Sequence, residues 1–478
     1  MIRGAVLVML VMAAPGRAQR TPGDSASRWV DSVFVPFTSR QTPGCAVGVT
    51  QNGVLTLAKG YGMADLEHDT PITPETRFYI ASVSKQFTAM SLVLLAKDHR
   101  LSLDDSLRKW VPEVPAFGAG ITLREVLHHT SGLRDYFTLL AVSGWPSDGQ
   151  LTDKQLLSLV RRQKSLNFPP GDEFLYSNTG YALLSIVVKR ASGQSLRDFA
   201  AARIFKPLGM THTEYRDDHT ALIPDRALGY QFAGGAYRLS QPEIDVVGDG
   251  GVYSTIEDLA KWDANFTSGK VGGRDAIAQL ETPGKLNDGQ PIEYALGLSI
   301  GESSGLRTYS HGGSYGGYRS EILRIPAKRL SVITLCNTAS ASSTLAEQVA
   351  RIFLGLAAEK TNLATTEIPP SVMAFGGAQV QADTSEARQR NDRLALLAGR
   401  YYSEELDMAV TLSARDGVLV MTRPRSDELR FVPFAEDLFT NSDKMLLRVV
   451  RDQNGAVTGF TLTVNRVRDL EFTRRETP

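Results

Sequence analysis

The sequence predicts an α+β fold, one antiparallel sheet with a helical domain, followed by a small all-β antiparallel barrel or sandwich. Within residues 25–358, strand-like runs stand at both ends and helical runs fill the middle. From about residue 393 the chain changes to short alternating runs separated by turn signals. The 478 residues, 22% of them charged, are an ordinary globular composition with length for two or three domains.

The first domain opens with strand-forming sequence. Residues 25–37 predict a short amphipathic helix, and residues 45–62 give two apolar runs around Asn52-Gly53, which indicates a hairpin. Length and periodicity predict three helices in the middle, at 86–97, 151–163 and 180–193. Strands are then predicted at 294–300, 306–313, 318–326 and 330–337, before a closing helix at 344–359. We expect the two groups of strands to pair into one sheet.

The composition changes after Glu359. Residues 359–392 are rich in Thr, Ala, Pro and Gly and predict a linker, and residues 393–478 predict the second domain. Its strand-like runs are 399–402, 408–414, 418–423, 429–434, 444–450, 457–464 and 470–475.

The charge balance and the N-terminal residues limit the possible partners and the compartment of the protein. Formal net charge is zero, so nothing favours a nucleic-acid partner. Residues 1–18 have an arginine, an apolar run and small residues before Gln19, which is typical of a signal peptide. We therefore expect a secreted or periplasmic protein with no membrane span after cleavage. Cys45 and Cys336 both lie in strand-like runs, and two buried thiols are the simpler interpretation.

One candidate site is Ser82 with Lys85, at the start of an apolar helical run. Residues three apart in a helix lie on one face, so the hydroxyl and the amine would meet. Such a pair also arises by chance, as Ser106 and Lys109 show. A lysine in the first turn of a helix opposes the helix dipole, however, and such a local cost is common at functional sites.

Two further stretches accompany this pair. Tyr176-Ser177-Asn178 precedes a helix, and His311-Gly312-Gly313 ends a strand-like run. In this order the three motifs resemble the serine β-lactamase and penicillin-binding protein family, in its class C, D-peptidase and esterase branch. The resemblance runs from about Thr42 to Gly355 and includes "LREVLHHTSGL", "IFKPLGMTHT" and "GDGGVYSTIEDLAKW". The last hundred residues resemble the lipocalin-like barrel that some members carry.

The resemblance implies a β-lactamase/transpeptidase-like α/β sandwich and acyl transfer through a serine ester. Ser82 would be the nucleophile, and Lys85 or Tyr176 would accept its proton. The oxyanion would be bound by the backbone N–H groups of Ser82 and Ser314. No metal or cofactor is implied. The residues expected to contact the substrate are Asn178, His311, Gly312, Gly313 and Ser314.

One departure from the family affects the expected substrate. His311-Gly312-Gly313 stands where β-lactamases of this family usually have Lys-Thr-Gly, so recognition of a penicillin carboxylate should be weaker. Arg319 is a candidate for the missing charge. We expect a hydrolase of small amide, peptide (including D-amino-acid) or ester substrates. The alternatives are a penicillin-binding or sensor protein with little turnover and an efficient class C-type β-lactamase.

Further motifs in the chain resemble those of other protein classes or indicate structural roles. Gly-x-Ser-x-Gly, the nucleophile elbow of α/β-hydrolases, occurs around Ser303 and Ser314, but strand-like sequence follows both, where that motif needs a helix. His128 and His129 are expected to be structural. The resemblance also implies that the first and last strands of the sheet are neighbours, which is compatible with a bridge between the two cysteines.

Overall fold

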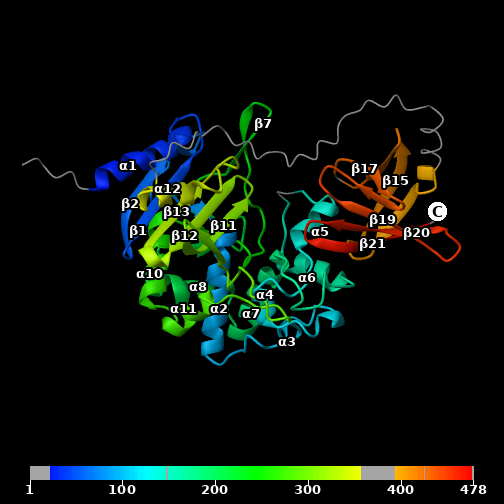
Figure 1. The fold of residues 1–478 in the computed structure, drawn as a ribbon, viewed down its shortest axis with the longest axis horizontal. Coiled ribbons are helices and arrows are strands. Elements are labelled where there is room, and N and C mark those ends of the chain that lie inside the picture. The colour runs from blue at the N-terminus through cyan, green and yellow to red at the C-terminus, as the bar shows by residue number, and fades with distance from the viewer. Residues whose placement is uncertain (1–21, 147–148, 357–392, 425, 476–478) are drawn as a thin grey trace, which may run out of the picture.

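The computed structural model describes residues 22–146, 149–356, 393–424 and 426–475. Residues 22–356 form a sandwich of helices and a sheet, and residues 393–475 form a barrel beside it (Figure 1). The predicted signal peptide and the predicted linker lie outside the described residues. Among the described helices, none combines the length and the apolar character that crossing a bilayer requires.

The sheet confirms that strands from both ends of the domain pair together. Its order is β10-β11-β12-β13-β1-β2, and the pairs are antiparallel. Asn52 and Gly53 have φ of 54° and 78°, the left-handed values that a tight hairpin turn between β1 and β2 requires. The strands are β1 Cys45–Gln51, β2 Val54–Tyr61, β10 Ser299–Ser303, β11 Leu306–Tyr315, β12 Tyr318–Ile325 and β13 Leu330–Cys336.

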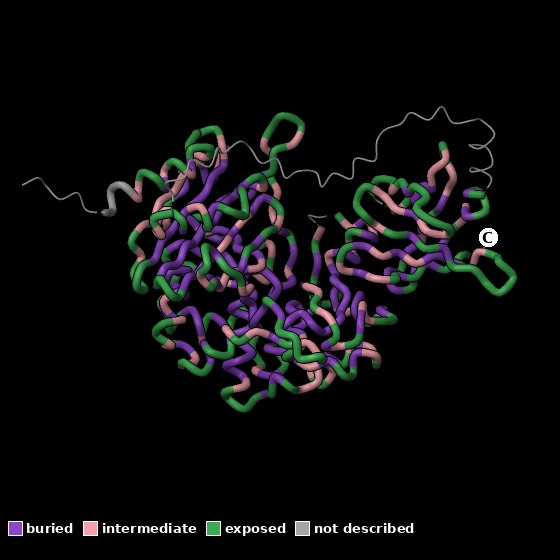
Figure 2. Tube along the Cα trace, viewed as in Figure 1, coloured by how far each residue is buried: buried purple, intermediate pink, exposed green. Residues whose placement is uncertain are grey.

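Helices cover both faces of this sheet. On the outer face α1 (Pro22–Val33) packs on α12 (Leu345–Phe353), which buries its apolar stripe against β13. On the inner face α10 (Ile256–Ser268) contacts β1, β2 and β13. Behind it lie α2 (Lys85–Lys97) and α7 (Asn178–Ser192), which are buried along most of their length (Figure 2). Gly193, with φ 80°, ends α7 as predicted.

The rest of this domain consists of short elements. The helices are α3 Leu107–Trp110, α4 Leu123–Leu127, α5 Tyr136–Val142, α6 Asp153–Arg162, α8 Leu196–Ala200, α9 Lys206–Leu208 and α11 Gly273–Glu281. The helical turns are η1 Val35–Phe37, η2 Ala81–Ser84, η3 Ala116–Gly118, η4 Ala201–Phe205 and η5 Pro326–Lys328. The small strands are β3 Met63–Asp65, β4 Thr70–Pro71, β5 Phe78–Tyr79, β6 Glu214–Tyr215, β7 Tyr230–Ala233, β8 Ala236–Leu239 and β9 Val252–Ser254.

Two predictions for the sheet of the first domain need correction. The strand expected at 294–300 begins only at Ser299. Gly297, with φ 74°, approaches α2 so closely that a Cβ would lie 2.8 Å from the Lys85 carbonyl carbon, so this segment serves as a buried spacer. The interpretation of Cys45 and Cys336 as two buried thiols is also wrong: they face each other across β1 and β13 and form a disulfide.

The second domain is a closed barrel rather than a sandwich. The sequence did not predict β18, which is only three residues long. The barrel strands are β14 Gly399–Ser403, β15 Met408–Arg415, β16 Val418–Thr422, β17 Leu429–Ala435, β18 Leu438–Thr440, β19 Leu446–Arg451, β20 Val457–Val464 and β21 Val467–Arg475.

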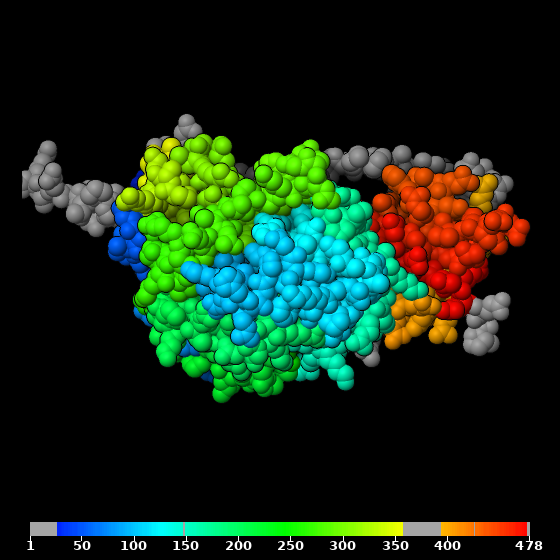
Figure 3. Space-filling view, turned by 90° about the horizontal axis from the view of Figure 1, so that it is seen from below, coloured from blue at the N-terminus to red at the C-terminus, as the bar shows by residue number. Residues whose placement is uncertain are grey.

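The barrel packs against the helical side of the first domain (Figure 3). Arg134 and Glu405 form a buried ion pair across the contact, with side chains 1% and 2% exposed. Arg134 also donates to the backbone carbonyls of Arg468 and Asp469 at 2.7 and 3.2 Å, and Lys164 N donates to Glu405 at 2.9 Å. The barrel is thus held against the first domain by a buried ion pair and by hydrogen bonds to backbone groups.

Candidate active site

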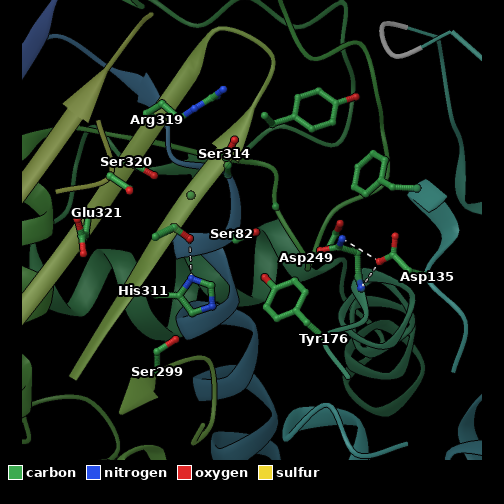
Figure 4. Close-up of a pocket in the computed structure, with 18 of the residues that line it drawn as sticks. Ser82, Asp135, Tyr176, Asp249, Ser299, His311, Ser314, Arg319, Ser320 and Glu321 are labelled. Atoms are coloured by element: carbon green, nitrogen blue, oxygen red, sulfur yellow. Dashed lines mark hydrogen bonds between the residues drawn. The ribbon is translucent and has the colours of Figure 1, made fainter. Parts of the chain in front are cut away.

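Ser82 lies on the 3₁₀ turn η2, one turn before α2 begins at Lys85. The residue before it, Ala81, has φ 45°, a strained left-handed conformation that costs on the order of 1–3 kcal/mol for a residue other than glycine. Ser82 lines a large cleft between β11 and the loop that carries Tyr176 (Figure 4). The helix predicted at 86–97 is α2, and Ser82 stands on the 3₁₀ turn that precedes it.

Lys85 is fully buried directly behind Ser82. Its Nζ lies 3.2 Å from Ser82 Oγ, and it also donates to Asn178 Oδ1 at 2.9 Å and to the carbonyl oxygen of Asp249 at 2.6 Å. These three partners are uncharged oxygens. Burial lowers the pKa of Lys85 from 10.5 to about 7, although the nearby carboxylates of Asp249 and Asp135 oppose that shift. An amine with such a pKa is a base at neutral pH.

Tyr176 lies on the other side of Ser82, in the loop before α7. The Lys85 ammonium lies 4.8 Å from the centre of its ring. Burial raises the pKa of Tyr176, while its hydrogen-bonding interaction with Ser82 acts in the opposite direction. His129 packs against the ring with 4.1 Å between centroids, and its Nδ1 accepts from Ser177 N at 3.1 Å. His129 thus has a structural role, as expected from the sequence, and the loop that it supports is the one that carries Tyr176.

Asn178 links Lys85 to a buried carboxylate. While its Oδ1 accepts from Lys85, its Nδ2 and its backbone N donate to Asp135 Oδ2 at 2.9 and 2.8 Å. Asp135 also caps α5 by accepting from Thr138 N at 3.0 Å. These bonds fix the Asn178 amide so that its oxygen faces the lysine.

Asp249 places a second buried carboxyl group beside Lys85. Its Oδ2 accepts from the Tyr136 hydroxyl at 2.9 Å, and its Oδ1 has no hydrogen-bond partner within the described part of the chain. Burial raises the pKa of this carboxyl, and the Lys85 charge opposes the rise. Asp249 lines the cleft and Lys85 lies buried beneath it, and the charge of each acts on the other.

Strand β11 forms the opposite wall. Strand β10 pairs with it only as far as Ser310, so the edge from His311 to Ser314 is open on that side. A Cβ on Gly313 would lie 2.2 Å from Ser320 Oγ and 2.3 Å from the Ile80 carbonyl oxygen, so only glycine allows β11 to approach η2. A Cβ on Gly312 would meet nothing closer than 3.9 Å.

The side chain of His311 is engaged within the protein. Its Nδ1 donates to the Gly312 carbonyl at 2.7 Å, so its Nε2 accepts from the Tyr294 hydroxyl at 2.9 Å. Burial, with a further contribution from the Lys85 charge, lowers the pKa of His311 to about 3. The imidazole is neutral at pH 7 and does not replace the lysine that stands there in related β-lactamases.

Arg319 does not supply that charge beside Ser82 either. Its Nη1 donates to the carbonyls of Gly316 and Tyr318 at 3.0 and 2.7 Å, and its side chain points away from Ser82 in Figure 4. The second arginine among the described residues that line the cleft is Arg466 of the barrel. Its Cζ lies 4.7 Å from the centre of the Tyr176 ring, and its Nη1 lies 3.8 Å from Asp135 Oδ2.

The remaining sequence motifs do not form a second nucleophilic centre in the described part of the chain. Ser106 donates to the Ala119 carbonyl at 2.9 Å, and Ser303 donates to Glu347 at 3.1 Å. Ser314 is part of β11, which a second strand follows, so it is not on a nucleophile elbow. Among the described residues, two clusters have ligand atoms close enough to share a metal ion, and neither lines the cleft: Asp65, Glu67 and His68, and Asp218, His219 and Asp245.

The structure thus brings together the site residues expected from the sequence and adds others. Ser82, Tyr176, Asn178 and the segment 311–314 line one cleft, and Lys85 lies directly beneath it. Asp135 and Asp249 were not predicted, although both lie in or beside stretches that carry the family resemblance. Arg466 had no signal in the sequence, because it reaches the cleft from another domain.

Comparison with known proteins gives the family. Residues 30–357 match the family described as Beta-lactamase. The D-aminopeptidase of Brucella anthropi is 32% identical over 327 residues, which are 67% of this chain and 61% of that protein. This chain therefore belongs to the β-lactamase family of serine hydrolases, as the motifs indicated. It spans only about three fifths of the length of the curated relatives it matches.

Solved structures show the same fold. The octameric penicillin-binding protein homologue from Pyrococcus abyssi is 25% identical with a TM-score of 0.62, over 95% of this chain and 100% of that one. EstCE1, a hydrolase with promiscuous acyltransferase activity, is 22% identical with a TM-score of 0.59, over 70% of this chain and 99% of its own. The first of these alignments extends across the barrel, and the second supports the fold alone.

Proposed function

We propose that this chain hydrolyses small amide, peptide or ester substrates through an acyl ester on Ser82. One observation carries the proposal: the fully buried Lys85 amine lies 3.2 Å from Ser82 Oγ and has its pKa lowered to about 7. A serine hydroxyl needs a base to become a nucleophile, and this amine is placed and tuned for that task.

The proposed reaction has two stages. Ser82 Oγ attacks the substrate carbonyl carbon while its proton passes to Lys85 Nζ, either directly or by relay through the Tyr176 hydroxyl, which gives its own proton to Lys85 as it takes the one from Ser82. The tetrahedral oxyanion is bound by the backbone N–H groups of Ser82 and Ser314 on the open edge of β11, which contribute about 3–4 kcal/mol each in comparable sites. The amine or alcohol leaves with the transferred proton, and water then cleaves the Ser82 ester.

The substrate class rests on the relatives and on the cleft. A D-aminopeptidase relative supports amide or peptide substrates with D-residues, and EstCE1 is a hydrolase of the same fold. The neutral, internally bonded His311 argues against efficient recognition of a penicillin carboxylate at the position of the family lysine. We rank a peptidase or amidase level with an esterase, and an efficient β-lactamase below both.

The test compares two serine variants of the full chain. Ser82→Ala should abolish turnover of p-nitrophenyl acetate and should form no covalent adduct with a penicillin in intact-mass measurements. Ser106→Ala, the matched control in the other Ser-x-x-Lys pair, should behave as wild type. Undiminished turnover in pure Ser82→Ala protein would refute the proposal. A lasting Ser82 adduct with no hydrolysis of any ester would favour the penicillin-binding alternative.

Export is part of the proposal. The Cys45–Cys336 disulfide supports it, since such bonds persist mainly in oxidising compartments. The mature protein recovered from a periplasmic or culture-medium fraction should begin at Gln19. Recovery of the full-length chain in the cytoplasmic fraction alone would contradict this part.

A further inference from the structure

The barrel contributes a turn to the wall of the catalytic cleft. Strands β20 and β21 are joined at Asn465 and Arg466, and this turn lines the same cavity as Ser82 and Tyr176. In Figure 1 these strands lie beside α5, which begins next to Asp135. Part of the proposed substrate site therefore comes from a domain that the catalytic motifs do not belong to.

The backbone of this turn is held firmly against the first domain. The Arg466 carbonyl accepts from Asp135 N at 3.3 Å and from Asn167 Nδ2 at 3.0 Å. Asn167 Oδ1 accepts from Arg468 N at 2.8 Å, and the Arg468 guanidinium binds both Glu173 oxygens at 2.8 and 2.9 Å. The position of Arg466 is thus fixed by bonds on both sides of it.

The guanidinium of Arg466, in contrast, keeps its donors free. It lies over the Tyr176 ring, and its distance of 3.8 Å from Asp135 is too long for a hydrogen bond. The Asp135 oxygens already accept from Asn178 and Thr138. Within the described residues no group accepts a hydrogen bond from this guanidinium, and one third of the side chain (33%) is exposed in the cleft.

A guanidinium with free donors beside a nucleophile fits one kind of ligand best. Its planar fork matches the two oxygens of a carboxylate, and such charge-assisted pairs are stronger than neutral hydrogen bonds. The other two candidates for a cationic contact are excluded by their geometry, because His311 is neutral and internally bonded and Arg319 binds the carbonyls of its own hairpin. Asp135 is 1% exposed and its oxygens already accept from Asn178 and Thr138, so it leaves the donors of the Arg466 guanidinium available.

We propose that Arg466 forms a carboxylate-binding subsite, so that the barrel selects substrates carrying an anionic group near the scissile bond. This inference rests on the acyl-transfer function proposed above. It predicts that the chain prefers acyl donors or peptides with a free carboxylate over their uncharged counterparts. It also gives the barrel a direct role in specificity.

Binding can be tested without turnover. In the Ser82→Ala background, N-acetyl-D-alanine and its uncharged primary amide are titrated by calorimetry. We expect the carboxylate to bind at least about tenfold more tightly, the factor that the loss of one charge-assisted hydrogen bond produces. Arg466→Gln should remove this preference and Arg466→Lys should keep part of it. Equal affinities for the two ligands, or no binding of either, would overturn the subsite.

Kinetics separate recognition from an effect on the catalytic groups. The ratio of kcat/KM for mono-p-nitrophenyl succinate to that for p-nitrophenyl acetate should fall at least about tenfold in Arg466→Gln. The matched control Arg448→Gln, an exposed arginine of β19, should leave the ratio at the wild-type value. Equal losses on both esters would overturn the subsite and leave Arg466 as a charge that only tunes Lys85 and Tyr176. If the wild-type chain shows no turnover that depends on Ser82, the proposed function fails. The binding experiment still tests the subsite in that case, because it uses Ser82→Ala protein and needs no turnover.

Discussion

The Lys85 ammonium nitrogen lies 3.2 Å from the Ser82 hydroxyl oxygen, although no carboxylate oxygen bonds to it. The carboxylates of Asp135 and Asp249 make no hydrogen bond to this nitrogen and act on it through their charge alone. The charged form of the lysine therefore gains little stabilisation from its neighbours, and burial lowers its pKa to about 7. With this pKa and this distance, Lys85 can act as the base for Ser82.

The pH dependence of activity follows from that pKa. Below about pH 7 Lys85 is protonated and cannot accept the Ser82 proton, so kcat/KM should rise with pH through about 7 and level off above it. Tyr176 does not produce this limb, since burial raises its pKa above the ordinary value of 10. The pH profile of p-nitrophenyl acetate hydrolysis measures the limb. An activity that is flat between pH 5 and 9 would contradict Lys85 as the base.

Asp249→Asn should shift this limb to lower pH. The Asp249 carboxylate favours the charged form of Lys85, so its removal lowers the lysine pKa further. The amide can still accept from the Tyr136 hydroxyl, and the backbone carbonyl that binds Lys85 stays in place. Asp245→Asn, a carboxylate bonded to His219 outside the cleft, is the matched control and should leave the limb unmoved. A shift of the limb to higher pH would contradict the predicted effect of the Asp249 charge on the Lys85 pKa.

The sequence revealed those parts of the site that are local in the chain. Asn52-Gly53 fixes a hairpin through its own backbone preference, and Ser82 and Lys85 meet because they are three residues apart. Asp135 and Arg466 meet only because the barrel docks beside α5. No periodicity or spacing encodes such a contact. The same holds for Gly297, whose role depends on how closely it approaches α2.

Gly313 and Gly312 should respond differently to alanine. A Cβ at Gly313 would overlap the Ile80 carbonyl, and overpacking of this kind typically costs about 1–3 kcal/mol of unfolding free energy. Gly313→Ala should also reduce activity strongly, because it pushes β11 away from the turn that carries Ser82. Gly312→Ala places its methyl group 3.9 Å from the nearest atom, the Ser320 carbonyl oxygen, and should leave the unfolding free energy unchanged. Equal stability of the two variants in urea would refute this account.

Loss of the Cys45–Cys336 bond should destabilise the first domain. The bond joins residues 291 positions apart and constrains the unfolded chain, and removing a native disulfide typically costs about 2–5 kcal/mol. The variant Cys45→Ala with Cys336→Ala should therefore melt below wild type. Addition of a reductant should lower the Tm of wild type but leave that of the double variant unchanged. Equal melting of oxidised and reduced wild type would show that the bond contributes nothing.

The Arg134–Glu405 pair should be essential for barrel docking. Both side chains are almost fully buried, so Arg134→Met leaves an unpaired carboxylate, and breaking a buried pair in this way costs about 3–5 kcal/mol. The double variant Arg134→Met with Glu405→Met should recover much of the loss, because no buried charge is then left alone. Denaturant unfolding, followed by the fluorescence of the intact chain, measures both.

The control for this prediction is the neighbouring glutamate. Glu404 pairs with Lys164 at the exposed rim of the same contact, so Glu404→Gln should change the unfolding curve little. Because the Arg134 guanidinium also binds the carbonyls of Arg468 and Asp469, its loss should loosen the turn that carries Arg466. Arg134→Met should then weaken any preference for anionic esters as well. A variant with wild-type stability and wild-type ester preference would show that the barrel is held by its other contacts.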